Sequence, residues 1–178
     1  MDSKLFDAFC RSYMLDKEKD KRFFDLISEQ YNTPEVQSLR QYEQHLEIDR
    51  LQHITSVTYV AYKLSEHFGC DTQSVVRAAI MHDLFYYDWR DGENGKWHRL
   101  HGYKHPKYAA LNAKELFPDL SKKEFDIIRR HMWPLTVFIP NSKEGFIVSL
   151  SDKYCATMEL LYSMSPSYKQ KFRSIIGK

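Results

Sequence analysis

The chain has 178 residues, of which 43% are hydrophobic and 28% charged, a balance that fits one globular domain with a buried core. Its 26 basic and 24 acidic residues give a net charge of +2, which predicts no nucleic-acid partner. No apolar run approaches the ~20 residues of a membrane span, and the N-terminus is unlike a signal peptide, so we expect a cytoplasmic protein without a membrane partner. The three widely spaced cysteines predict neither a disulfide framework nor a thiolate zinc site.

Helix-breaking residues are sparse, with six Gly and six Pro in the whole chain. Segment 35–68 contains neither residue type, and its apolar side chains recur at helical spacing from Leu51 onwards, which predicts a helix. Thr33 and Pro34 supply an N-cap and a first helical residue before this segment. Gly69 supplies a stop signal after it.

The rest of the chain also has helical patterns. Asp71 or Thr72 can cap a short buried helix, and Ser121 with Glu124 forms a capping box for another. These further helices are predicted at 71–85, 105–116, 121–131, 140–164 and from 165 on, with long loops at 88–103 and 132–142. No segment shows the two-residue alternation of a strand. We therefore predict an all-α single domain of seven or eight helices, with its core at about 46–162 and packing helices at 1–45 and 163–178.

One ionisable side chain, or an adjacent pair, faces the expected core in each of five predicted helices. These groups are His53, the pair His82 and Asp83, His105, His131 and Asp152. A single buried histidine is most often a hydrogen-bonded core residue, but a buried carboxylate without a partner is costly. Imidazoles and carboxylates together are the ligand set of Zn, Fe, Mn, Co or Ni, and a dication satisfies all of them at once. The pattern therefore predicts a metal site.

The order of these groups resembles that of the HD-domain superfamily of metal-dependent phosphohydrolases. The similar stretches are RLQHITSV (50–57), AAIMHDL (78–84), HPKYAALNA (105–113), IIRRHMW (127–133) and VSLSD (148–152). The resemblance implies an HD-type helical bundle with two metal ions. It implies that His53, His82, Asp83 and Asp152 hold one ion, and that Asp83, His105 and His131 hold the other, with Asp83 bridging.

The resemblance also implies a reaction. Two divalent ions, of Fe, Mn, Zn, Co, Ni or Mg, can share a hydroxide that attacks a phosphorus centre. Asp83 would act in catalysis as the bridging ligand, and Asp88 is a candidate general acid or water-orienting group. The candidates for binding the phosphate are Arg50, Arg99, His101, Lys104 and Arg130. Each of these residues is also compatible with a solvated surface.

The sequence predicts a class of substrate and no individual compound. The pattern is most similar to the symmetrical dinucleoside tetraphosphate hydrolases, which implies a nucleotide, a dinucleoside polyphosphate or a related small phosphate ester. The aromatic and basic stretch after the dyad (82–105) departs from that group, and Trp89 within it either stacks on a nucleobase or packs the loop. Two alternatives stay open, a di-iron oxygenase with the same ligands and a non-catalytic nucleotide-binding or regulatory module. A homodimer stays open as well.

Overall fold

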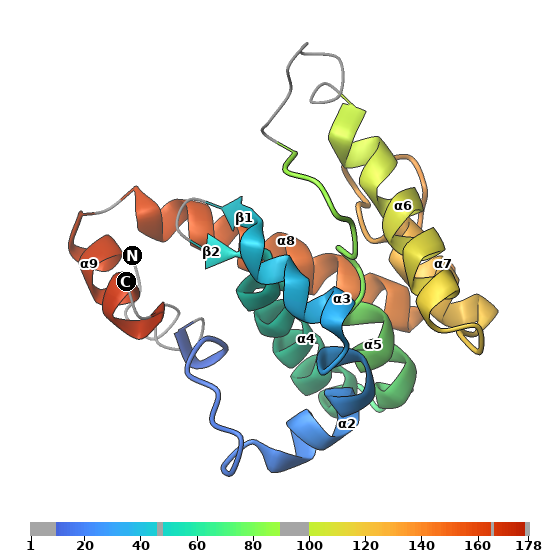
Figure 1. Ribbon diagram of the computed structural model, residues 1–178, viewed down its shortest axis with the longest axis horizontal. Helices are drawn as coiled ribbons and strands as arrows, with labels where there is room; N and C mark the ends of the chain where they lie inside the picture. The colour runs from blue at the N-terminus through green and yellow to red at the C-terminus, as the bar shows by residue number, and fades with distance from the viewer. Residues whose placement is uncertain (1–9, 46–47, 90–99, 165, 177–178) are drawn as a thin grey trace.

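The computed structural model describes residues 10–45, 48–89, 100–164 and 166–176 (Figure 1). Within them the chain folds into eight α-helices, one 3-10 helix and one two-stranded sheet, which confirms the all-α prediction. The α-helices are α2 (Lys21–Tyr31), α3 (Pro34–Gln37), α4 (Arg50–His67), α5 (Thr72–Ala79), α6 (His101–Leu116), α7 (Lys122–Arg130), α8 (Lys143–Ser163) and α9 (Pro166–Ile176). The 3-10 helix η1 (Ser38–Gln41) and the antiparallel strands β1 (Glu43–His45) and β2 (Ile48–Asp49) lie between α3 and α4. No helix in this part of the chain has both the length and the apolar character needed to cross a membrane.

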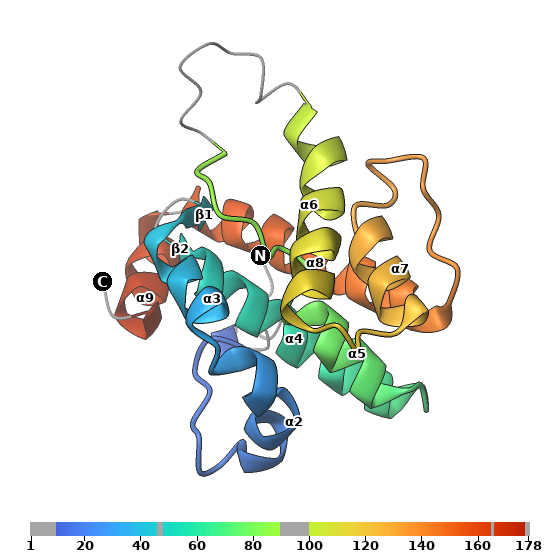
Figure 2. The ribbon, with the colours of Figure 1, turned by 45° about the vertical axis from the view of Figure 1, so that its right-hand side comes forward.

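Helix α4 lies at the centre of the fold. It packs against α5 and α8, and α2 packs on α5 (Figure 1). Helices α6 and α7 pack on each other, and α7 also contacts α5 and α8 (Figure 2). Ile54 and Val57 of α4, Val76 of α5 and Val148 of α8 are completely buried. The core therefore lies between α4, α5 and α8, with α7 against two of these helices.

Local capping residues explain where several helices begin and end. Thr33 accepts a hydrogen bond from the backbone of α3, and Asp71 accepts one from the backbone of α5. Ser121 and Glu124 form the expected capping box of α7. Gly69 follows α4 with a φ of 59°, a conformation that residues with a side chain rarely adopt. The boundaries predicted from these residues are confirmed.

The helix predicted at 35–68 is interrupted. Helix α3 ends at Gln37, and η1, β1 and β2 separate it from α4. Helix α4 begins after Asp49 because the Asp49 side chain accepts a hydrogen bond from the backbone N of Gln52, at 2.8 Å, and Gln52 Oε1 accepts one from the backbone N of Asp49, at 3.2 Å. The prediction of a continuous helix without strands was wrong here, because residues 40–47 are mostly polar and offer no apolar stripe for a helix to bury.

The helix predicted at 71–85 ends early, at Ala79. The next backbone hydrogen bonds are of the tighter 3-10 type, as from His82 N to Ala79 O at 3.3 Å. The Nδ1 atom of His82 also bonds to the Ala79 carbonyl oxygen, at 2.7 Å, so this carbonyl is satisfied without a further helical turn. His82 and Asp83 are therefore presented by a turn, which corrects the expectation that they lie on a helix.

Candidate metal centre

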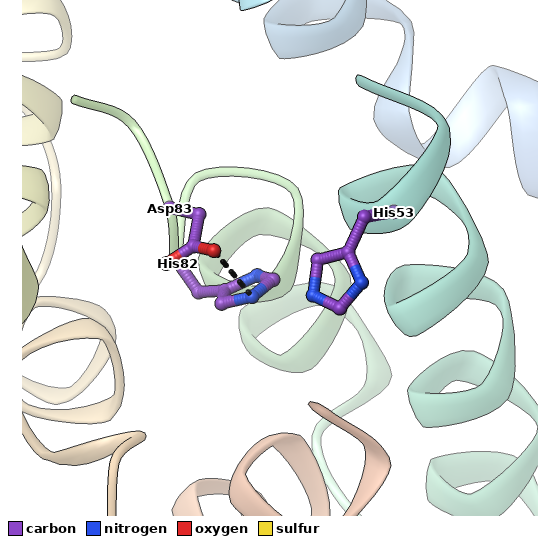
Figure 3. Close-up of side chains that lie close together, drawn as sticks. All are labelled: His53, His82 and Asp83. Carbon is purple, nitrogen blue, oxygen red and sulfur yellow. Dashed lines mark ion pairs between the residues drawn. The ribbon is translucent and has the colours of Figure 1, made fainter. Parts of the chain in front are cut away.

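Six buried side chains meet in the interior from four helices and one turn. They are His53 of α4, His82 and Asp83 of the turn after α5, His105 of α6, His131 at the C-terminal cap of α7, and Asp152 of α8. None of them is more than 6% exposed. Figure 3 shows His53 on one side, with its ring toward His82, and Asp83 beside His82. The structure therefore brings together all six side chains that the sequence singled out as ligands.

Three of the histidines are held by backbone carbonyl groups. Their Nδ1 atoms lie 2.7 Å from Ala79 O (His82), 3.0 Å from His101 O (His105) and 2.8 Å from Ile128 O (His131). A carbonyl oxygen only accepts hydrogen bonds, so each Nδ1 carries a proton and donates it. Each Nε2 atom is thereby directed into the site, which is how a metal-binding imidazole is oriented by its surroundings.

Atoms with lone pairs crowd together at the centre of the site. The Nε2 atoms of His105 and His131 lie 3.0 Å apart, and Asp83 Oδ1 lies 3.2 Å and 3.6 Å from them. Two imidazole lone pairs at this distance repel each other unless a proton or a metal ion lies between them. Within the described residues, Asp83 Oδ1 and His82 Nε2 are buried without a hydrogen-bond partner. These orphaned atoms fit a site built for a cation.

Three sets of ligand atoms in the described part of the chain could each hold a metal ion, with the atoms of a set within 4.8 Å of one another. The sets are His53, His82 and Asp83; His82, His131 and Asp152; and Asp83, His105 and His131. The last set matches the second metal site that the family resemblance implied. For the first implied site, Asp152 Oδ1 lies 3.3 Å from His53 Nε2 and 3.8 Å from His82 Nε2. The residues therefore suit a divalent metal ion. The binding of two ions remains a prediction.

The two carboxylates of the site are ionised in spite of their burial. Burial raises the pKa of Asp83, but His82 and His105 outweigh it and hold the pKa well below the usual range. Burial also raises the pKa of Asp152, and Lys153 is the largest of the groups that lower it well below the usual range. Both side chains are thus in the form that binds metal.

The histidines divide into two kinds by their surroundings. Burial lowers the pKa of His82, and it lowers the pKa of His131 well below the usual range. Burial lowers the pKa of His53 as well, but the carboxylates of Glu159 and Asp152 raise it to about 10. His82 and His131 are therefore neutral at neutral pH, whereas His53 is paired with a carboxylate at each ring nitrogen, 2.8 Å from Glu159 and 3.3 Å from Asp152.

A pocket of about 190 Å³ opens over this centre. Besides four of the six predicted ligands, its lining consists of Gln44, Trp89, His101, Gly102, Met132, Leu135, Lys153 and Ala156. The ring of His101 stacks between Trp89, at 5.7 Å, and His105, at 4.5 Å between ring centroids. The lining therefore combines polar and cationic side chains with aromatic and apolar ones.

Arg50 supports Asp83 through Gln44. The Arg50 Nε donates to Gln44 Oε1 at 2.9 Å, and Gln44 Nε2 donates to Asp83 Oδ2 at 2.7 Å. Because arginine only donates and carboxylate only accepts, this chain fixes which way the Gln44 amide points. Arg50 Nη1 also donates to Phe85 O, at 2.6 Å, and Nη2 to Tyr87 O, at 3.2 Å.

These contacts give Arg50 a structural role, and its role in substrate binding stays a prediction. The side chain is completely buried, and its guanidinium lies 3.6 Å from the centroid of the Phe85 ring. Burial lowers the pKa of Arg50 to about 10, so the group stays charged at neutral pH. Arg50 therefore holds the segment that carries Asp83, and it is not among the described residues that line the pocket.

Arg130 is likewise part of the scaffold. Its Nε donates to Asp126 Oδ1, at 2.5 Å within α7, and its Nη1 donates to the Ile139 carbonyl, at 2.9 Å in the following loop. Arg130 is not among the described residues that line the pocket. Its guanidinium ties the 132–142 loop to α7, and its contact with substrate stays a prediction.

The other predicted residues differ in their placement. His101 lines the pocket, as a substrate-binding residue should. Lys104 lies on α6 and Asp88 in the segment after the dyad, and neither belongs to the described lining of the pocket. Arg99 lies outside the described residues. The roles assigned to His101, Lys104, Asp88 and Arg99 therefore remain predictions.

Three residues of this region were missed in the sequence. Lys153 Nζ lies 2.5 Å from Asp152 Oδ2 and lines the pocket, and its position next to Asp152 could have indicated it. Glu159 follows Asp152 by two helical turns on the same face of α8, which is a usable signal. Gln44 has no such signal, because it lies in a short strand whose pairing the sequence did not predict.

The comparison with protein families agrees with this geometry. A family model described as the HD domain matches residues 50–157, more than half of the chain. The chain belongs to the HD-domain family. HD domains typically bind divalent metals and act as metal-dependent phosphohydrolases, so the resemblance seen in the sequence is confirmed at this level. No curated protein and no solved structure shows significant similarity to this HD-domain chain.

Proposed function

We propose that this HD-domain protein is a phosphohydrolase with two divalent transition-metal ions, and that it cleaves a nucleotide or another small phosphate ester. The observation that carries the proposal is the cluster of lone-pair atoms at the base of the pocket, where His105 Nε2, His131 Nε2 and Asp83 Oδ1 lie within 3.6 Å of one another. The matching family model supports the reaction class. The proposed substrate class is supported by the lining residues and the volume of the pocket.

The ligands divide between two positions. His53, His82, Asp83 and Asp152 would hold one ion, and Asp83, His105 and His131 would hold the second. When bound, two such ions polarise a phosphoryl group and make water a nucleophile at neutral pH. The mixture of imidazole and carboxylate suits Mn, Fe, Co, Ni or Zn better than Mg, which prefers oxygen ligands.

The pocket residues suit the two ends of a phosphate ester. Lys153 is 22% exposed in its side chain and presents an ammonium group beside Asp152, where a phosphoryl oxygen can accept a charge-assisted hydrogen bond. Trp89 and Met132 offer an apolar wall for the organic part of the ester. The pocket volume of about 190 Å³ is below the ~300–1,000 Å³ of typical ligand pockets, which favours a small substrate.

The test begins with protein freed of metal by a chelator. It is reloaded with Mn, Fe, Co, Ni, Zn or Mg, and phosphate release is measured from nucleotides, dinucleoside polyphosphates and simple esters. We expect metal-dependent release that Asp83→Asn lowers by at least about 1,000-fold, the order of loss when a central catalytic group is removed. Asp25→Asn, which changes an exposed carboxylate of α2 paired with Lys21, should leave it unchanged.

Two other results would each point to a different function. Oxygen consumption by the iron-loaded protein, without phosphate release from any ester, would indicate the di-iron oxygenase. Nucleotide binding without turnover under every metal would indicate a binding or regulatory module. Helix content measured by circular dichroism shows whether Asp83→Asn remains folded, so that loss of activity can be assigned to the site.

A further inference from the structure

A buried carboxylate outside the matched family region contacts the candidate metal centre through the Nδ1 atom of His53. Glu159 lies on α8 and is 2% exposed. Its Oε1 atom lies 2.8 Å from His53 Nδ1 and also accepts a hydrogen bond from the Tyr13 hydroxyl group. Its Oε2 atom is buried and has no hydrogen-bond partner among the described residues. The matched family region ends at residue 157, so family membership does not account for this contact.

His53 differs from the other three histidines in what orients its ring. His82, His105 and His131 each bond through Nδ1 to a backbone carbonyl, whereas the Nδ1 atom of His53 faces a side-chain carboxylate. A carboxylate on the far nitrogen fixes the tautomer of a metal-binding imidazole and makes its other nitrogen a stronger ligand. With Nδ1 bonded to Glu159, the Nε2 atom of His53 lies 3.3 Å from Asp152 Oδ1, inside the site.

We infer that Glu159 is a positioning residue of the metal centre, and that Tyr13 holds Glu159 in place. The inference rests on the proposed metal centre. It assigns to Glu159 a role in setting the affinity and ligand field of the ion that His53 binds, without contact between Glu159 and that ion.

The segment that carries Tyr13 is itself anchored to the fold. The Tyr13 ring packs edge-on against Phe172 of α9, with the ring centroids 5.0 Å apart. The Ser12 hydroxyl lies 2.6 Å from that of Ser56, which is on α4 three residues after His53. Tyr13 therefore reaches Glu159 from a fixed position, and chain segments on both sides of the family match support the His53 ligand.

The competing explanation is that Glu159 and His53 form a buried ion pair that only stabilises the core. The two explanations differ in what they predict for metal binding. An ion pair in the core affects the unfolding of the metal-free protein, whereas a positioning residue also changes the binding constant of the ion. Glu159→Gln is informative because the amide oxygen can still accept from His53 but carries no charge.

The experiment titrates the chelator-treated full chain with Mn²⁺ by calorimetry and with Co²⁺ by its visible absorption spectrum. For Glu159→Ala we expect one of the two binding steps to weaken by about 10- to 100-fold, with a changed Co²⁺ spectrum, as for other residues behind a metal ligand. Glu159→Gln should show part of this loss, and Tyr13→Phe a smaller loss of about threefold. Unfolding of each metal-free variant is measured in parallel.

Glu124→Gln is the matched control. Glu124 is also a buried carboxylate, 4% exposed, but it pairs with Arg77 and caps α7 away from the six ligands. This variant should lower the unfolding midpoint and leave both metal constants and the Co²⁺ spectrum unchanged.

The inference is overturned if Glu159→Ala and Glu159→Gln bind both ions as the wild type does. If Glu159→Ala does not fold, Glu159→Gln and Tyr13→Phe decide the question in the same way. Failure of the wild type to bind Mn²⁺ or Co²⁺ is a different result, because it removes the metal centre and the proposed function together. Wild-type binding with unaffected variants leaves the metal centre standing and refutes only the role of Glu159.

Discussion

The Nε2 atoms of His105 and His131 lie 3.0 Å apart, with the far side of each ring bonded to a backbone carbonyl group. The two residues come from α6 and from the cap of α7, and these helices pack on each other. The pair therefore comes from two helices that carry neither His53 nor Asp152, which lie on α4 and α8. This separation allows one half of the centre to be removed while the other half stays.

Replacement of both His105 and His131 by Ala should lower bound metal from about two equivalents to about one, since one of the two ions of a binuclear site loses two ligands. Metal analysis after reloading and dialysis measures the stoichiometry. His67→Ala, which changes an exposed histidine at the end of α4, should keep both equivalents. A wild type that holds only one tight equivalent would refute the binuclear assignment.

Gln44→Ala should weaken Mn²⁺ binding by about tenfold, because Asp83 Oδ2 loses the hydrogen bond that orients it. Gln44→Glu should weaken it further, since it places a second carboxylate close to Asp83. Calorimetric titration gives both constants. Gln37→Ala removes an amide that donates to Tyr31 O, at 2.6 Å, and serves as the control. Equal affinities in all three variants would show that Gln44 does not orient Asp83.

Arg50→Met should lower the free energy of unfolding by about 3 kcal/mol, because two buried acceptors and one partly buried acceptor lose a charged donor. Arg50→Lys should be destabilised to a similar extent, since one ammonium group cannot reach all three acceptors. Urea unfolding in the presence of a chelator measures both effects without a contribution from bound metal. If Arg50→Lys unfolds like the wild type but has a raised KM, the sequence-based assignment to substrate binding is the right one.

Lys153→Met should raise KM for a phosphorylated substrate by about tenfold or more, since a hydrogen bond to a charged group contributes about 1.5–3 kcal/mol. Lys104→Met tests the sequence-based prediction for α6 in the same assay. The structure places only Lys153 in the described lining of the pocket, so we expect the larger change there. A raised KM for Lys104→Met alone would mean that the phosphate binds on the α6 side.

The features that could be predicted from the sequence depend on residues close together in the chain. The capping box of Ser121 and Glu124 spans three residues, and the stop at Gly69 requires only the backbone freedom of that residue. The six candidate ligands were found because each is an ionisable group among apolar neighbours, and because their order resembles that of a known family. That order does not indicate how the side chains are held.

The features that the sequence did not reveal depend on contacts between distant segments. Gln44 bonds to Asp83 across 39 residues, and the orientation of its amide group depends on Arg50 as well. Arg50 itself looks like a surface cation at a helix start, and only the packing of Phe85 against it shows that it is buried. Glu159 meets His53 across 106 residues, so the helical pattern of α8 shows its face but not its partner.

The carbonyl oxygens behind His82, His105 and His131 belong to the main chain, which every residue type possesses. Substitutions at Ala79, His101 or Ile128 that preserve the backbone therefore leave these acceptors in place. The orientation of the three rings should tolerate a change of residue type at those positions. His53 differs from these three residues, because its Nδ1 atom faces the side chain of Glu159. A single codon change at Glu159 removes that acceptor. Among random mutants of this protein, loss of one of the two proposed ions should therefore arise more often through substitution of the acceptor of His53 than through substitutions near the acceptors of the other three histidines.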